Sequence, residues 1–124
     1  MNKKYIEQSI PKAIKYIEEN KNIYNENENA VPNEFMGYVS SFAVAVTLAG
    51  PIQAVTFYED NNHSARFPRE EMISVIKKLM EVEDLIEHLK NNPLEKSKLI
   101  DSAIAFKMAL RVFKLKKGMS PWKI

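Results

Sequence analysis

The segment FMGYVSSFAVAVTLAGPIQAVTFY, residues 35–58, contains no charged side chain over 24 positions, which is long enough to cross a bilayer. Gly50 and Pro51 interrupt it in the middle, because glycine commonly ends a helix and proline commonly opens one. Its flanks are acidic, Glu34 on one side and Glu59 on the other, so no Lys or Arg anchors or orients a membrane span. The segment therefore predicts a helical hairpin in a protein core, with a membrane hairpin as the weaker alternative.

Helical periodicity extends from this hairpin in both directions, with apolar residues at steps of three and four. We expect helices at about residues 2–22, 33–49, 51–59, 68–91 and 93–117, with Asn33 and Asn92 as N-caps, Pro11 as a kink or a new first turn, and Gly118 as the final stop. Residues 20–33 are rich in Asn and Glu and predict a polar loop, and residues 118–124 a flexible tail. No alternating strand pattern of useful length occurs. The predicted fold is all-α, a single domain of residues 1–124 that forms a compact bundle of five or six helices.

The composition excludes several classes of chemistry. The 124 residues include no cysteine, so disulfides, Cys-ligated zinc, iron–sulfur clusters and thiol nucleophiles are absent. Three glycines leave no glycine-rich phosphate-binding motif. Glu7 and Lys12 interrupt any apolar run behind the basic N-terminal residues, so no export signal is evident and we expect a cytoplasmic protein.

Candidate catalytic groups are few. His63 lies in an Asn-rich loop, and His88 with Asp84 or Glu87 supplies at most two metal ligands on one helix face, which do not make a site. A solvated helix surface explains His88 better. The carboxylate pairs are accompanied by no nucleophile or base at useful spacing; they are Glu70-Glu71 and Glu83-Asp84. We therefore expect a protein that is not an enzyme and that uses no metal and no cofactor.

Positive charge gathers near the C-terminal end. The net charge is +2, but residues 96–124 carry eight basic side chains and one acidic one, whereas residues 59–95 carry five basic and nine acidic. The last predicted helix contains a row of apolar core residues and a row of cations spaced four and three residues apart. The apolar row and the cationic row therefore form adjacent stripes on the helix. The core row is Leu99, Ala103, Phe106, Leu110 and Phe113, and the cations are Lys107, Arg111 and Lys114, extended by Lys116 and Lys117.

A row of cations on a rigid helix suits a phosphate backbone, because each contact releases a condensed counterion. These five residues are the candidate RNA-binding site, and Trp122 is the free aromatic candidate for stacking on a base. The alternative is that the lysines only solvate the outer face and complement the helix dipole.

Residues 38–58 resemble the small subunit of the Cmr complex, the type III-B CRISPR RNA-silencing effector. The likeness comes from a helix that ends in a small residue and Gly50, followed by a short helix reading AVTFY at residues 54–58. The stretch ALRVFKLKK, residues 109–117, is similar to the last helix of that family, in which a small-Leu-Arg-hydrophobic pattern runs into basic residues. Pro51 stands where the family usually has Leu, and Phe113 where an aromatic such as Trp is common.

The resemblance implies a non-catalytic subunit that acts in antiviral defence. It implies stacking on copies of itself along the guide-RNA filament, contact with other Cmr subunits, especially the filament backbone subunit, and binding of the guide–target RNA duplex through a basic face. The acidic residues 59–95 and the basic end would then form unlike patches for stacking. The second hypothesis is a helical protein–protein adaptor or oligomerisation module with no nucleic-acid role.

Overall fold

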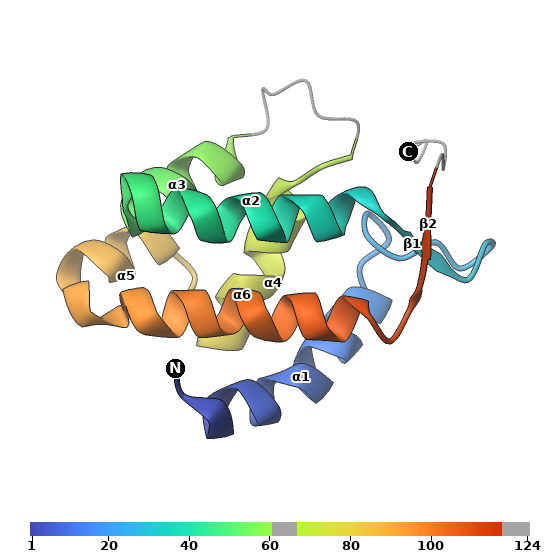
Figure 1. The fold of residues 1–124 in the computed structure, drawn as a ribbon, viewed down its shortest axis with the longest axis horizontal. Helices are drawn as coiled ribbons and strands as arrows, with labels where there is room; N and C mark the ends of the chain where they lie inside the picture. The colour runs from blue at the N-terminus through green and yellow to red at the C-terminus, as the bar shows by residue number, and fades with distance from the viewer. Residues whose placement is uncertain (61–66, 118–124) are drawn as a thin grey trace.

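The computed structural model describes residues 1–60 and 67–117 (Figure 1). The predicted loop around His63, the stop at Gly118, the flexible tail and Trp122 lie outside the described residues. Helices dominate, and the elements in chain order are α1 (Lys3–Glu18), β1 (Ala30–Pro32), α2 (Glu34–Ala49), α3 (Pro51–Glu59), α4 (Glu70–Met80), α5 (Leu85–Asn91), a 3-10 turn η1 (Pro93–Glu95), α6 (Lys96–Leu110) and β2 (Lys114–Lys116). The prediction of an all-α bundle is confirmed.

Helix α6 is the central element, since it packs against α1, α2 and α4 (Figure 1). Leu99, Ala103, Phe106 and Leu110 are all buried, as the predicted core row requires. Small buried residues between them, such as Ala105 and Ala109, let neighbouring helices approach on more than one side. Helix α6 is thus buried along most of its length. The cations at its C-terminal end nevertheless reach the surface.

The uncharged segment forms the predicted hairpin. Helix α2 ends at Ala49, Gly50 adopts a φ of 99° that L-residues rarely take, and Pro51 opens α3. Phe42 packs edge-to-face on Tyr58 with ring centroids 5.2 Å apart, which closes the two helices on each other. Within the described residues, no helix is long and apolar enough to cross a membrane.

The first helix ends earlier than predicted, and the predicted cap of the second helix lacks a side-chain hydrogen bond. Asn2 caps α1 by accepting a hydrogen bond from the Tyr5 backbone N–H at 3.0 Å, and the helix runs through Pro11 before it ends at Glu18. Pro11 is thus inside the helix and does not start a new one. Asn33 precedes α2 but makes no side-chain capping bond.

The single helix predicted for residues 68–91 is divided. Helix α4 ends at Met80 because Glu81 adopts a left-handed conformation, with φ 58° and ψ 44°. Asp84 then caps α5, its carboxylate accepting the Glu87 backbone N–H at 3.1 Å. Asn92 does not cap the next helix as predicted; its amide donates to the His88 carbonyl at 2.9 Å at the end of α5.

The polar loop predicted for residues 20–33 contains a buried strand. Ala30 and Val31 are fully buried in β1, which pairs in parallel with β2, placing Val31 opposite Leu115. A buried backbone needs hydrogen-bond partners, and the chain after α6 supplies them, including the Lys116 carbonyl that accepts the Asn33 N–H at 3.0 Å. This pairing explains why the predicted helix over residues 93–117 is wrong at its end, since α6 stops at Leu110.

Candidate nucleic-acid interface

Lys107 lies in the last turn of α6 and reaches over α2. Its Nζ donates to the Ser40 Oγ at 3.3 Å, and both side chains are close to solvent. The ammonium group has three donors, so this one bond leaves capacity for an anionic ligand. Lys107 therefore places a positive charge at the seam between α6 and the outer face of α2.

Arg111 follows directly as the C-cap of α6 and is exposed. Lys114 does not continue the helix face, since it lies in β2, where it is also exposed. We predicted that Lys107, Arg111 and Lys114 share one helix face. The prediction is wrong for Lys114, because the helix ends before it. These cations project from the end of a helix and from the strand that follows it.

Lys116 differs from the other predicted cations. Its Nζ forms an ion pair with Glu28, in the segment that precedes β1. Lys117 follows β2 and is exposed. Within residues 1–60 and 67–117, Lys116 is the one member of the predicted set that pairs with a carboxylate, so its charge is largely neutralised by the same molecule.

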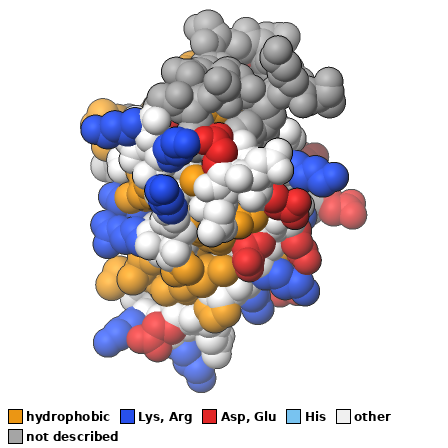
Figure 2. All heavy atoms as spheres, turned by 90° about the vertical axis from the view of Figure 1, so that its right-hand side faces the viewer, with side chains coloured by type: hydrophobic (Ala, Val, Ile, Leu, Met, Phe, Trp, Pro, Cys, Tyr) orange, Lys and Arg blue, Asp and Glu red, His pale blue; other side chains and the backbone are white. Residues whose placement is uncertain are grey.

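Side chains of both charges are exposed at this end of the molecule. Figure 2 looks at the end where α6 stops and the two strands lie; Lys and Arg occur on both sides of that face, with more of them on the left, and most Asp and Glu lie on the right. A shallow hollow of about 360 Å³ lies between β2 and the region around the end of α1, and its lining includes Lys114 as well as the carboxylates Glu18 and Glu28. Among the described residues, Lys107 and Arg111 do not line this hollow.

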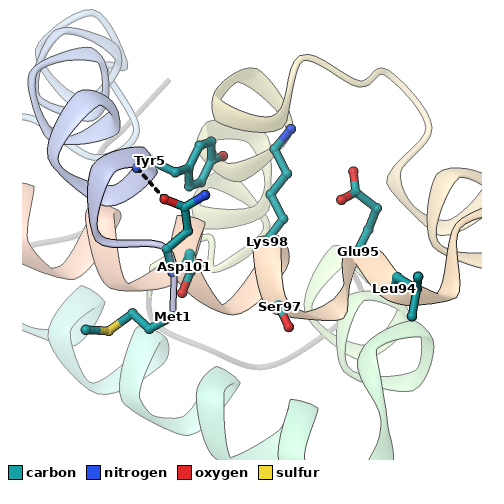
Figure 3. Close-up of a pocket in the computed structure, with 8 residues that line it drawn as sticks. Met1, Tyr5, Leu94, Glu95, Ser97, Lys98 and Asp101 are labelled. Atoms are coloured by element: carbon teal, nitrogen blue, oxygen red, sulfur yellow. Dashed lines mark hydrogen bonds between the residues drawn. The ribbon is translucent and has the colours of Figure 1, made fainter.

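A larger hollow of about 490 Å³ lies where α1 and α6 begin (Figure 3). Asp101, 3% exposed, accepts the Asn2 backbone N–H at 2.9 Å, and the Tyr5 hydroxyl lies 2.7 Å from the Ser102 Oγ. Lys98 and Glu95 extend in one direction and Ser97 in another, so the polar groups do not converge on one point. The contacts anchor the start of α1 to α6.

The histidine that the structure describes serves the fold. His88 is partly buried, not solvated as predicted, and its Nε2 lies 3.0 Å from the Glu95 Oε1, joining α5 to η1. Asp84 is occupied as the α5 cap. Among the described residues, no group of three or more His, Asp or Glu side chains is arranged to hold a metal ion.

Two residues that the sequence analysis did not single out form an exposed pair. Phe57 on α3 is 58% exposed, and the Arg69 Cζ lies 4.1 Å from the centroid of its ring. Phe57 could have been recognised from its position, because the buried side of α3 is Ala54, Val55 and Tyr58. The contact with Arg69 could not, since the two residues belong to different elements.

Two phenols lie beside this pair. Burial raises the pKa of both Tyr38 and Tyr58, while the nearby Arg69 charge acts in the opposite direction on each. Tyr38 hydrogen-bonds the Phe67 backbone, donating to the carbonyl at 3.0 Å, and Ser41 hydrogen-bonds Tyr58. Both phenols are therefore neutral hydrogen-bonding groups at neutral pH.

No protein-family model matches the chain, and comparisons with curated proteins and with solved structures found no match.

Proposed function

We propose that the protein binds the phosphate backbone of RNA through the basic surface that Lys107, Arg111, Lys114 and Lys117 form where α6 ends and β2 begins. The observation that carries the proposal is that these four cations are solvent-accessible and form no ion pair within residues 1–60 and 67–117, although Lys114 lines a hollow together with the carboxylates Glu18 and Glu28. Such contacts give affinity with little sequence choice, because phosphates carry no sequence information.

Within that class, the resemblance of residues 38–58 and 109–117 supports a role as the small subunit of a type III-B CRISPR (Cmr) effector in antiviral defence. The protein would be a cytoplasmic, non-catalytic subunit without a cofactor. It would stack on copies of itself and on other Cmr subunits, especially the filament backbone subunit, and hold the guide–target duplex. The hairpin α2–α3 and the cations after α6 are the parts of the structure that match the residues of the resemblance.

A variant that neutralises the basic surface tests the proposal. Lys107→Gln/Arg111→Gln/Lys114→Gln should bind RNA more weakly, and the slope of log K against log salt should fall by about 2, at roughly 0.7 per lost contact with single-stranded phosphate. Fluorescence anisotropy of a labelled RNA at several salt concentrations measures both quantities. Circular dichroism and urea unfolding establish that the variant is folded.

A matched control removes the same charge elsewhere. Lys3→Gln/Lys4→Gln/Lys12→Gln changes three exposed lysines of α1 and should leave the salt slope close to that of the parent. Equal losses in the two variants would mean that only net charge matters, and unchanged affinity in the first would refute the proposed surface.

The adaptor hypothesis has its own supporting observation. Leu48 is 81% exposed and Val44 56% exposed on α2, and both are apolar side chains that a protein partner could cover. An adaptor without a nucleic-acid role predicts no salt-dependent RNA binding by the parent protein, together with binding to anionic proteins. Titrating the same sample against RNA and against acidic proteins separates the two functions.

A further inference from the structure

We propose that Phe57 and Arg69 form a nucleobase-stacking site for single-stranded RNA, reached from the basic surface across the outer face of α2. The inference rests on the proposed RNA-binding function and adds a contact to bases to the contacts with phosphates.

Phe57 presents an aromatic face to solvent. Its side chain is 58% exposed although its neighbour Tyr58 on the same helix is buried. Its ring contacts the ring of the buried Tyr58, with centroids 5.6 Å apart, but more than half of the residue remains exposed. Such rings are common stacking partners for unpaired bases, because every base has a π face.

Arg69 is held beside that ring by three contacts. Its Cζ lies 4.1 Å from the Phe57 centroid and 5.1 Å from the Tyr58 centroid, and its Nη2 donates to the Phe57 carbonyl at 3.4 Å. The guanidinium is therefore positioned in the unbound protein, so little side-chain entropy remains to be lost when a ligand arrives. A guanidinium group can both stack beside a base and pair with a phosphate.

The outer face of α2 connects this pair to the basic surface. Ser40 accepts the Lys107 Nζ at 3.3 Å on one side, and Ser41 hydrogen-bonds Tyr58 on the other. One turn earlier, Gly37 is exposed, and a Cβ added there would meet no atom within 4 Å. This part of the helix thus offers a low, uncharged surface between Lys107 on one edge and Arg69 on the other, where Glu34 and Glu70 also act on Tyr38.

Charge and shape favour single-stranded RNA as the occupant. Cations at both edges complement a polyanion, and the small side chains between them leave room for its backbone. A base must be unstacked to lie on Phe57, which a strand can do at low cost and a duplex cannot. The single-stranded part of an RNA ligand would therefore cross α2 while its phosphates meet Lys107 and Arg69.

The test compares two ligands and three proteins. The ligands are a labelled single-stranded oligouridine and an abasic oligomer of the same length, and the proteins are the parent, Phe57→Leu and Leu48→Ala. Phe57→Leu keeps an apolar side chain but removes the π face, and we expect it to weaken oligouridine binding roughly ten-fold. The salt slope should stay unchanged because Arg69 keeps its hydrogen bond to the backbone carbonyl of residue 57 and its contact with Tyr58, so its phosphate contact is retained. Leu48→Ala, an exposed apolar control on α2, should bind as the parent does.

The abasic ligand distinguishes stacking from a structural effect. The parent and Phe57→Leu should bind it equally, since it offers no base. Equal binding of oligouridine by both proteins would overturn the stacking site while leaving the basic surface intact, and an equal loss with both ligands would also overturn it. A smaller salt slope in the Lys107/Arg111/Lys114 variant, with a Phe57 effect on oligouridine alone, would support both proposals. No RNA binding by the parent would refute both.

A fluorescence variant gives an independent measurement. Phe57→Trp in a Trp122→Phe background places the only tryptophan at the proposed site. Its emission should be quenched by oligouridine and not by the abasic oligomer. Unchanged emission at saturating oligouridine would contradict the proposal.

Discussion

Glu81 is held in the left-handed region, with φ 58° and ψ 44°, where the side chain crowds its own backbone. The backbone there closes α4, because the Glu81 N–H donates to the Lys78 carbonyl at 3.2 Å and the Val82 N–H to the Lys77 carbonyl at 3.0 Å. Glycine is the residue that such a position prefers. The natural glutamate therefore costs stability at this turn.

We expect Glu81→Gly to raise the free energy of unfolding by about 1 kcal/mol, because it removes the left-handed penalty at a helix C-cap. Urea unfolding followed by circular dichroism measures the change. Glu83→Gly is the control, since Glu83 is exposed in the same linker and has no positive φ. A destabilisation in both variants would mean that the turn tolerates glutamate without strain.

Gly50 and Glu81 illustrate what single residues reveal before a structure is known. The hairpin turn was predictable, because Gly50 and Pro51 are residue types that the turn requires. The break at Glu81 was not, because a continuous apolar stripe crosses it and glutamate is a good helix former. Only the capping bond that Asp84 makes to Glu87 marks the start of α5, and aspartate is common on exposed helix faces as well.

Among the elements, the β1–β2 pair decides how the basic residues are displayed. It orients Lys116 toward Glu28 and leaves Lys114 and Lys117 exposed. Both side chains of the Lys116–Glu28 pair are partly exposed, so the pair contributes at most about 1 kcal/mol to stability. Under the proposed function, the pair should therefore affect RNA binding more than it affects folding.

We expect Glu28→Gln to raise RNA affinity several-fold at moderate salt while lowering the free energy of unfolding by no more than about 1 kcal/mol, because it releases the Lys116 charge. Anisotropy and urea unfolding on one preparation measure the two effects. Glu26→Gln makes the same change of net charge at an exposed position nearby and should have the smaller effect on affinity. Similar gains in both variants would show that Lys116 makes no specific contact.

This sheet was not predictable from the sequence. Each strand has three residues, too few for an alternating pattern to stand out, and the partners Ala30 and Lys114 lie far apart in the chain. The helical periodicity of residues 99–110 continues smoothly into the following residues, so nothing local marks the end of α6. The sequence was therefore enough to identify the candidate cations. It could not show how they are arranged on the surface, because that arrangement depends on the long-range pairing of β1 with β2.

At the scale of the whole molecule, α6 is surrounded by α1, α2 and α4, whereas α5 and η1 lie at one end (Figure 1). Eight residues of α6 are buried, but only Leu85 and Leu89 are buried in α5 and none in η1. The backbone amides that exchange hydrogen only when the whole protein unfolds should therefore lie in the middle of α6.

We expect native-state hydrogen exchange to be slowest in α6 and in the parts of α2 and α4 that contact it. Exchange in α5 and η1 should be faster, because local opening there exposes few buried side chains. Mass spectrometry of peptic fragments measures the rates. Protection of α5 equal to that of α6 would mean that the bundle opens as one unit.

The bundle itself was well predicted, because the spacing of apolar residues in long helices is a strong signal. The core row from Leu99 to Leu110 was correct at each position, and its successor Phe113 is only partly buried beyond the helix. The pair of Phe57 and Arg69 was beyond reach, because the contact arises from packing of α3 against the start of α4.

The open space above Gly37 has a practical consequence. The chain lacks cysteine, and a side chain at position 37 would point into solvent from a backbone with no positive φ. Gly37→Cys would thus give one thiol for attaching a spin label or a dye. The label on α2 would report directly when a molecule binds to that face of the helix.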